Sequence, residues 1–278
     1  SPRHSPTLSH LRRMTIAPFT LDDIITLTKL APADWDAMMA RLRWHMSPPY
    51  AVAIKSVFGE ALVSGLGTAV AHNGSGWIGE RLMMPRFKGP ELEGELLDAL
   101  MKELHTRECT TIYALVPAES LPVFEARGFV REGDYVCYAG GKSEPPTLDE
   151  VELCEPHHSM GILHLDRVAS GEQRRVLISE HFYASRIYVE KGRVRGSYMP
   201  LLGDGLLLAD RPDVGEELLR WHMPHVQEVW VPEANPVARE FLSIRGYTEQ
   251  GRRYRMHQGP ALPWKPEMVY GWINERLG

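Results

Sequence analysis

Glu80 is the carboxylate best placed for chemistry in this sequence. It lies in the strand-like run GWIGERLMM, on the same face as Ile78, in a stretch whose only other charge is Arg81. A carboxylate in such surroundings can accept a proton from a reacting group, which is the work of a general base. The alternative is an ion pair, with Arg81 or another basic neighbour, in which Glu80 only stabilises the strand. Both interpretations stay open.

A later strand-like run, DYVCYA, carries side chains that could donate a proton. These are Tyr135, Cys137 and Tyr138, since a phenol and a thiol can both serve as acids. Side chains alternate along a strand, so the register decides whether Tyr135 and Cys137 face a cleft. Tyr138 has no better role than packing, and core packing is the alternative for all three.

Imidazole, aromatic and charged side chains in the second half of the chain could form a substrate pocket. Its candidate lining is His181, Tyr183 and Tyr198, and the charged residues that could position it are Asp166, Arg167 and Arg174. Chance proximity is the competing explanation in a chain with 12 histidines. The sequence shows no Ser/His/Asp spacing, HExxH or Walker signature. Its three cysteines lack zinc-site spacing, so we expect no metal.

Composition favours a globular protein that binds small molecules. The 278 residues, 44% of them apolar, suffice for two domains of about 130 residues each. A net charge of −5 without blocks of like charge argues against nucleic acid or an anionic membrane as a partner. No apolar run approaches the roughly 20 residues that cross a bilayer. The scattered cysteines favour a reducing compartment, so we expect a cytoplasmic monomer or homodimer.

The chain repeats one order of elements. The strand-like TIYALVP and a helix-like segment ending in Gly128-Phe129 recur as VQEVWVP and a segment ending in Gly246-Tyr247. Each copy ends in a further strand, and each follows strand hairpins and an amphipathic helix. The hairpin strands are predicted at 50–56, 60–72 and 76–84, and again at 185–191, 193–202 and 205–210. We therefore predict domains at 14–141 and 156–278, a linker at 142–155, and a tag or disordered leader at 1–13.

Helices are predicted at two further places. Pro90 suits the first turn of a helix that presents an apolar face from Leu92 to Leu104. The last segment, 264–278, is predicted to be a short helix that docks through its aromatic side chains.

This order of elements resembles the GNAT acyltransferase fold, and the chain resembles a tandem GNAT protein over nearly all of residues 14–278. The resemblance is carried by WIGERLMMPRFKG, ELLDAL and FEARGF in the first half and by VPEANPVAREFLSIRGY in the second. It implies an α/β (α+β) fold with two GNAT-like domains, each a mixed, mainly antiparallel sheet flanked by helices.

The resemblance also implies a binding place for acyl-CoA. In the family, the cofactor lies where two neighbouring strands splay apart; a bulged strand binds its pantetheine arm, and a loop at a helix N-terminus binds its pyrophosphate. The matching positions here are Leu82, Met83, Met84, Phe87, Lys88, Gly89, Pro90, Glu91 and Gly94, with Phe124 on the following helix.

The chain departs from the family pattern in this loop. Alignment on Leu96-Leu97 puts Glu91 and Glu93 where the family has small residues, and a second register that starts at Arg86 still ends in Glu91. Carboxylates repel a pyrophosphate, although near a helix N-terminus they also stabilise the helix. The tyrosine that serves as the acid in many family members is replaced by Phe124 and, in the second half, by Leu242. Tyr135 and Cys137 are the acids considered in its place.

The resemblance implies an acyl-CoA-dependent N-acyltransferase, with acetyl-CoA as co-substrate, that acts on a small amine by direct attack in a ternary complex. Family members often carry a catalytic glutamate on the strand of Glu80. The alternative is a degenerate GNAT-fold protein that has lost CoA binding and acts as a binding module or performs other chemistry. Two residues in the second half also match the family: Gly215, in its phosphate loop, and Asn235, which N-capping explains equally well. A catalytic second half therefore stays open.

Overall fold

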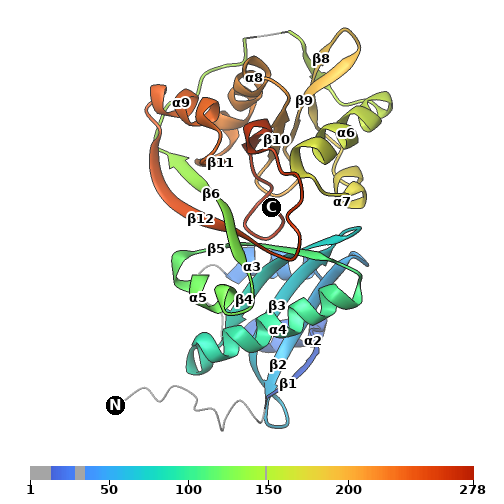
Figure 1. Ribbon diagram of the computed structural model, residues 1–278, viewed down its shortest axis with the longest axis vertical. Coiled ribbons are helices and arrows are strands. Elements are labelled where there is room, and N and C mark those ends of the chain that lie inside the picture. Colours follow the sequence, from blue (N-terminus) through green and yellow to red (C-terminus); the bar gives the residue numbers. More distant parts are fainter. Residues whose placement is uncertain (1–13, 29–34, 148) are drawn as a thin grey trace. The chain divides into compact units, whose positions relative to one another are not determined.

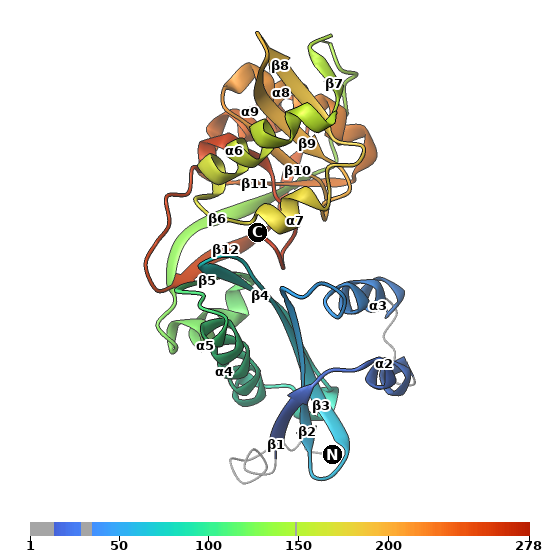
Figure 2. The same cartoon turned by 90° about the vertical axis from the view of Figure 1, so that its right-hand side faces the viewer.

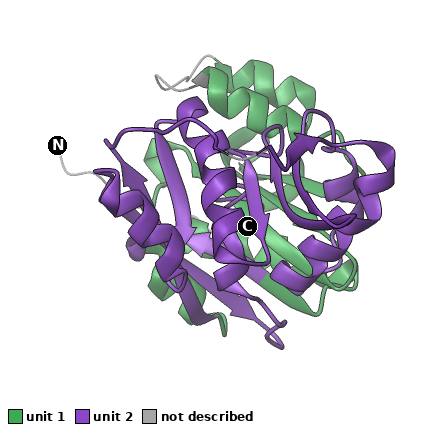
Figure 3. Cartoon of the chain, turned by 90° about the horizontal axis from the view of Figure 1, so that it is seen from above, with its two compact units in different colours: residues 1–112, 120–129 green, residues 113–119, 130–278 purple. Residues whose placement is uncertain are grey.

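The structure is a computed structural model that describes residues 14–28, 35–147 and 149–278 (Figure 1). The chain divides into two compact units (Figure 3). Unit 1 comprises residues 1–112 and 120–129, and unit 2 comprises residues 113–119 and 130–278. In the described ranges, no helix is long and apolar enough to cross a membrane.

Unit 1 contains an antiparallel sheet in sequence order. Its strands are β1 (Met14–Pro18), β2 (Ala51–Phe58), β3 (Leu62–Ala71) and β4 (Ser75–Met83). Strands β2, β3 and β4 match the predicted strands to within two residues at each end, because the turns at Gly59 and Gly74, both with positive φ, fix the hairpins.

Helices cover both faces of this sheet (Figure 2). The helices of unit 1 are α2 (Leu21–Thr28), α3 (Trp35–Trp44), α4 (Pro90–Thr106) and α5 (Leu121–Glu125), with the 3₁₀ turn η1 (Pro85–Phe87) before α4. Apolar side chains of α2 and α3 pack on one face with Val63 and Leu66. The apolar face of α4 packs on β2, β3 and β4. The predicted starting point of α4 at Pro90 is confirmed.

Unit 2 contains a five-stranded antiparallel sheet in the order β13-β10-β9-β8-β7. Its strands are β7 (Val151–Leu153), β8 (Arg186–Glu190), β9 (Arg193–Met199), β10 (Leu206–Ala209) and β13 (Val269–Gly271). The helices are α6 (Ser159–Ser170), α7 (Arg175–Ser179), α8 (Pro212–His222) and α9 (Pro236–Ile244). The 3₁₀ turns are η2 (Ala118–Ser120), of which Ser120 belongs to unit 1, η3 (Pro156–His158), η4 (Met223–His225) and η5 (Pro266–Met268).

The closing strands of the two halves are exchanged. The strands concerned are β5 (Thr111–Val116), β6 (Val130–Ala139), β11 (Glu228–Pro232) and β12 (Thr248–Gln258). They lie in the order β5-β12-β6-β11, so β6 from the first half pairs antiparallel with β11 of the second, and β12 lies next to β5. Strand β6 therefore belongs to the same compact unit as the second half of the chain. The predicted domain limits around 142–155 stay a prediction.

The prediction of a C-terminal helix at 264–278 is wrong. This segment forms η5 and strand β13. Strand β13 pairs with the edge of β10, because an edge strand offers unpaired N–H and C=O groups that an extended segment can satisfy. Tertiary pairing thus overrides the helical spacing of the aromatic side chains.

Candidate active site

Strand β4 contains a β-bulge at Gly79 and Glu80. In the ladder with β3, Gly67 is opposite Arg81 and Ala69 is opposite Ile78, so these two residues of β4 face the single residue Thr68. The Thr68 Oγ1 atom accepts a hydrogen bond of 2.8 Å from the Glu80 N–H. A bulge of this kind interrupts the ladder and redirects a side chain. Here the redirected side chain is that of Glu80.

The Glu80 carboxylate is held by Arg41 of α3. The Nε–H of Arg41 donates to Oε1 at 2.8 Å, and the two side chains are 28% and 22% exposed. The sequence suggested Arg81 or another basic neighbour as the partner; the partner is Arg41, which sequence reasoning did not single out. A partly exposed and oriented carboxylate can exchange protons with a substrate or with water.

His45, one turn after Arg41, anchors α3 beside the bulge. Its Nδ1 lies 2.9 Å from the Arg41 carbonyl oxygen, and because a carbonyl can only accept, Nδ1 carries the proton. The side chain is buried, and its Nε2 is 3.5 Å from the point that a Cβ atom on Gly79 would take. Arg41 in α3 and His45 just after it therefore both lie beside the bulge.

Glu93 has a structural role in unit 1. Its Oε1 accepts from Ser120 Oγ at 2.8 Å and lies 3.3 Å from Arg81 Nε. The guanidinium of Arg81 also lies over the Phe124 ring, 4.7 Å from the centroid, and its Nη1 donates to the Gly79 carbonyl. This cluster ties α4 to β4 and to Ser120 at the start of α5.

The other residues matched to the cofactor loop divide into core and surface. Phe87 and Phe124 are buried, and Phe124 stacks edge-to-face on Phe129 at 5.0 Å. Leu82, Met83 and Met84 are partly buried against the two cores of unit 1. Pro90 opens α4, with Lys88 and Glu91 exposed beside it. Gly94 is buried where a Cβ atom would overlap the guanidinium of Arg127.

Tyr135 and Cys137 belong to unit 2, whereas Glu80 belongs to unit 1. Tyr135 packs against Trp264 and Trp272, with ring centroids 6.1 and 5.5 Å away. Burial raises its pKa to about 12. The Cys137 thiol donates to Glu228 Oε2 at 3.3 Å, and burial raises its pKa to about 12 as well. Both groups are protonated at neutral pH, and Tyr138, also buried, accepts from Arg239 Nε.

The predicted set His181, Tyr183 and Tyr198 combines a hydrogen-bonded imidazole, an exposed phenol and a buried phenol. Tyr183 is 82% exposed, and His181 Nδ1 donates to the Leu177 carbonyl at 2.7 Å. Tyr198 is buried, lies 3.1 Å from His222 Nδ1 through its hydroxyl, and lines a pocket of about 520 Å³. The role of the three residues in binding a substrate stays a prediction.

The charged set Asp166, Arg167 and Arg174 is brought together. These residues line a pocket of about 290 Å³ at α6 and the start of α7, where Arg167 is exposed. Arg174 donates from Nε and Nη2 to the Asp166 carboxylate at 2.8 to 3.1 Å, and both side chains are almost fully buried. Glu172, also buried, lies 3.9 Å from Arg174 Nη1. Two carboxylates therefore share one guanidinium in the base of this pocket.

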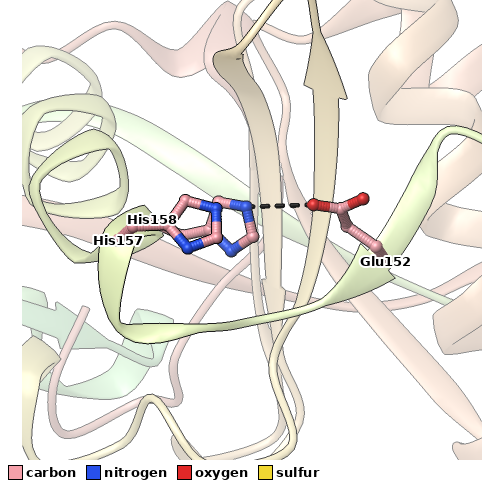
Figure 4. Close-up of side chains that lie close together, drawn as sticks. All are labelled: Glu152, His157 and His158. Carbon is pink, nitrogen blue, oxygen red and sulfur yellow. Dashed lines mark ion pairs between the residues drawn. The ribbon is translucent and has the colours of Figure 1, made fainter.

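One group of possible metal ligands occurs among the described residues, and its geometry has a structural explanation. Glu152, His157 and His158 lie close together (Figure 4). His158 Nδ1 accepts from the Glu155 backbone N–H at 2.9 Å in a capping box, so its proton is on Nε2, which lies 3.0 Å from Glu152. A metal at Nε2 would require the other tautomer and would break this cap.

Solved structures share this architecture over the length of the chain. A candidate acetyltransferase from Pyrococcus horikoshii has a TM-score of 0.78 at 21% identity and covers 99% of both chains. A GCN5-related N-acetyltransferase from Sphaerobacter thermophilus has a TM-score of 0.59 at 14% identity, over 91% of this chain and 99% of its own. A tandem GNAT protein from the clavulanic acid biosynthesis pathway has a TM-score of 0.51 at 14% identity, over 89% of this chain and 99% of its own.

The chain has a tandem GNAT fold. The prediction of this fold from the sequence is thereby confirmed, although no protein-family model and no curated protein matches the sequence. Identities of this size establish the fold alone.

The resemblance to the GNAT family implies acyl-CoA, and the start of α4 has features that suit its phosphates. The helix is 17 residues long and begins after Gly89 without a side-chain cap, so its first N–H groups and dipole favour an anion. Arg86 and Lys88 are exposed beside it, with no ion pair in the described part of the chain. Glu93 is turned toward Arg81, which leaves Glu91 as the opposing charge. Apart from Glu91, whose Oε2 lies 3.1 Å from the point that a Cβ atom on Gly89 would take, these residues suit the phosphates of the cofactor.

Proposed function

We propose that this protein is an acyl-CoA-dependent N-acyltransferase, with acetyl-CoA as donor and a small amine as acceptor, and that the first GNAT-like domain carries the reaction. The proposal rests on one observation: the β4 bulge presents the Glu80 carboxylate, held at 2.8 Å by Arg41. The fold of the structural relatives is consistent with it.

An amine must be neutral to attack an acyl carbon, so a base has to remove its proton. Glu80 takes this proton, directly or through a water molecule, and Arg41 keeps the carboxylate in one orientation. Arg86, Lys88 and the first turn of α4 would hold the pyrophosphate, and Leu82 to Met84 would line the pantetheine arm. When bound, acyl-CoA would supply the acyl group as an activated thioester: the N–C bond would form as the C–S bond breaks, and coenzyme A would leave as a thiolate that water can protonate.

The test combines calorimetry with kinetics. Acetyl-CoA should bind, and one member of a panel of polyamines, amino sugars and amino acids should be acylated. Glu80→Gln keeps the shape of the side chain but removes its basicity, so kcat should fall about 10²-fold while acetyl-CoA affinity is unchanged. Glu60→Gln, an exposed carboxylate in the turn before β3, is the control. Full activity of Glu80→Gln would show that its role is structural.

A second candidate function is that of a GNAT-fold binding module without CoA. The observation in its favour is the Arg81–Glu93–Ser120 cluster beside Phe124, which holds α4 in place. The buried Phe124 ring also stands where many family members have a tyrosine. Absence of acetyl-CoA binding, with a folded protein by circular dichroism, would favour this function.

A further inference from the structure

In the second half of the chain, a strand separates β10 from β11. By element order these two strands correspond to β4 and β5, the pair between which the resemblance places acyl-CoA. Strand β13 pairs antiparallel with β10, with Leu207 opposite Gly271 and Leu208 opposite Val269. It also packs on β11, and the Trp272 N–H donates to the Trp230 carbonyl at 3.2 Å.

We propose that this slot in the second GNAT-like domain is a receptor for a β-strand, filled by the chain's own segment 269–271, and that this domain therefore has no acyl-CoA site. The slot's hydrogen-bonding edge is already used by main-chain partners, as in β-strand addition. The proposal goes beyond the proposed function, because it concerns the domain to which no reaction is assigned.

Gly215, the glycine that matches the family in this half, lies against β13. Gly215 lies in the first turns of α8, and a Cβ atom at this position would overlap the ring of Tyr270, the central residue of β13. Tyr270 is almost fully buried. The absence of a side chain at Gly215 therefore makes room for an aromatic ring of the same chain.

Asn235, the asparagine that matches the family, also contacts β13. Asn235 Oδ1 accepts from the Ala238 N–H at 3.1 Å, which caps α9. Its Nδ2 donates to the Val269 carbonyl at 2.8 Å, and to that of Glu267 at 3.4 Å. One side chain thus joins the start of α9 to the strand in the slot, and capping alone accounts for only its oxygen.

Further contacts hold the end of the strand and the start of α8. The Trp272 ring stacks on Trp230 at 4.3 Å with an interplanar angle of 11°, and its Nε1–H donates to Asp204. At the start of α8, where the family binds pyrophosphate, Arg211 donates to both oxygens of Glu190 at 2.7 and 2.9 Å and to Asp213. This cation is already paired with carboxylates.

Asn235→Asp separates the strand contact from the cap. An aspartate still caps α9, but it cannot donate to the Val269 carbonyl. In hydrogen exchange on the full chain, peptides that contain 269–271 should exchange about tenfold faster than in wild type, whereas peptides from α9 should keep their protection. Unchanged exchange at 269–271 would contradict the role of Asn235.

The direction of the change in Tm for Gly215→Ala tests the packing of Tyr270. Alanine in a helix normally stabilises relative to glycine, but here it should lower Tm and speed exchange at 269–271, because it displaces Tyr270. The double variant Gly215→Ala/Tyr270→Ala should have a higher Tm than Tyr270→Ala alone, because the ring that alanine displaces is then absent. A rise in Tm for Gly215→Ala would overturn the packing argument.

Acetyl-CoA tests the slot directly. At concentrations that saturate any binding, exchange at 205–216 and 269–271 in the wild-type protein should stay unchanged, and calorimetry should give no more than one site per chain. Protection of 205–216 together with faster exchange at 269–271 would overturn the proposal. If acetyl-CoA binds nowhere, the proposed function fails, while the variants at Asn235 and Gly215 still decide the role of the slot.

Discussion

Arg41 and Glu80 form an ion pair of 2.8 Å between Nε and Oε1, although they are 39 positions apart in the sequence. Helix α3 and the bulge of β4 bring them together. The pair joins the candidate base to an element that no residue pattern connected with it.

Arg41→Gln tests whether this pair orients the base. We expect kcat to fall about tenfold, with acetyl-CoA affinity unchanged and unfolding free energy changed by less than about 1 kcal/mol, because both side chains are partly exposed. Steady-state kinetics and urea unfolding measure the two effects. Arg43→Gln, exposed on the same helix, is the matched control. A variant with unchanged kcat would assign the pair to stability alone.

Glu91 and Glu93 should behave differently when neutralised. Glu91→Gln removes an exposed charge beside the start of α4, so acetyl-CoA affinity should rise several-fold. Glu93→Gln weakens the contact with Arg81, whose side chain is 10% exposed, and should cost about 1–3 kcal/mol of unfolding free energy. Calorimetry and urea unfolding of both variants make the comparison. A loss of affinity in Glu91→Gln would place that carboxylate away from the phosphates.

Removing one partner of the Asp166–Arg174 pair should lower the unfolding free energy more than replacing both partners. Arg174→Met leaves the Asp166 and Glu172 carboxylates buried without their guanidinium, and we expect a loss of about 3–5 kcal/mol in unfolding free energy. The double variant Asp166→Leu/Arg174→Met should regain a substantial part of this loss. Chemical unfolding of the single and double variants checks it; equal losses would mean that the pair is not coupled.

His222 should make the protein less stable in acid. Burial, and then the charge of His225, lowers the pKa of His222 to about 4, below its ordinary value of about 6.5. The unfolded chain therefore binds the proton more readily, and stability that is fully present above pH 6.5 is lost as the pH falls toward 4. The loss at this site amounts to about 3 kcal/mol.

Urea unfolding between pH 4.5 and 8 measures this dependence. His222→Gln removes the titrating group and should flatten the curve in this window, whereas His225→Gln, at an exposed position, should change it little. An unchanged slope in His222→Gln would assign the acid sensitivity to other groups.

The sequence determined the local elements and the order in which they follow each other. Periodicity, the turn glycines and Pro90 set the strands of both meanders and the start of α4, because these signals act between residues a few positions apart. The repeated order predicted two similar domains, and their resemblance to a known family predicted the tandem GNAT fold. The carboxylate at Glu80 also stood out, since it interrupts an apolar strand.

Tertiary structure decided which distant segments meet. The bulge at Gly79 and Glu80, the partner Arg41, the exchange of β6 and β12 and the insertion of β13 all depend on pairing between segments far apart in the chain. Strand and helix patterns specify which face of an element is apolar, but many partners can satisfy the same face and the same edge. For this reason the helix predicted at 264–278 was wrong, and the contacts of Gly215 and Asn235 with β13 became visible only in the folded chain.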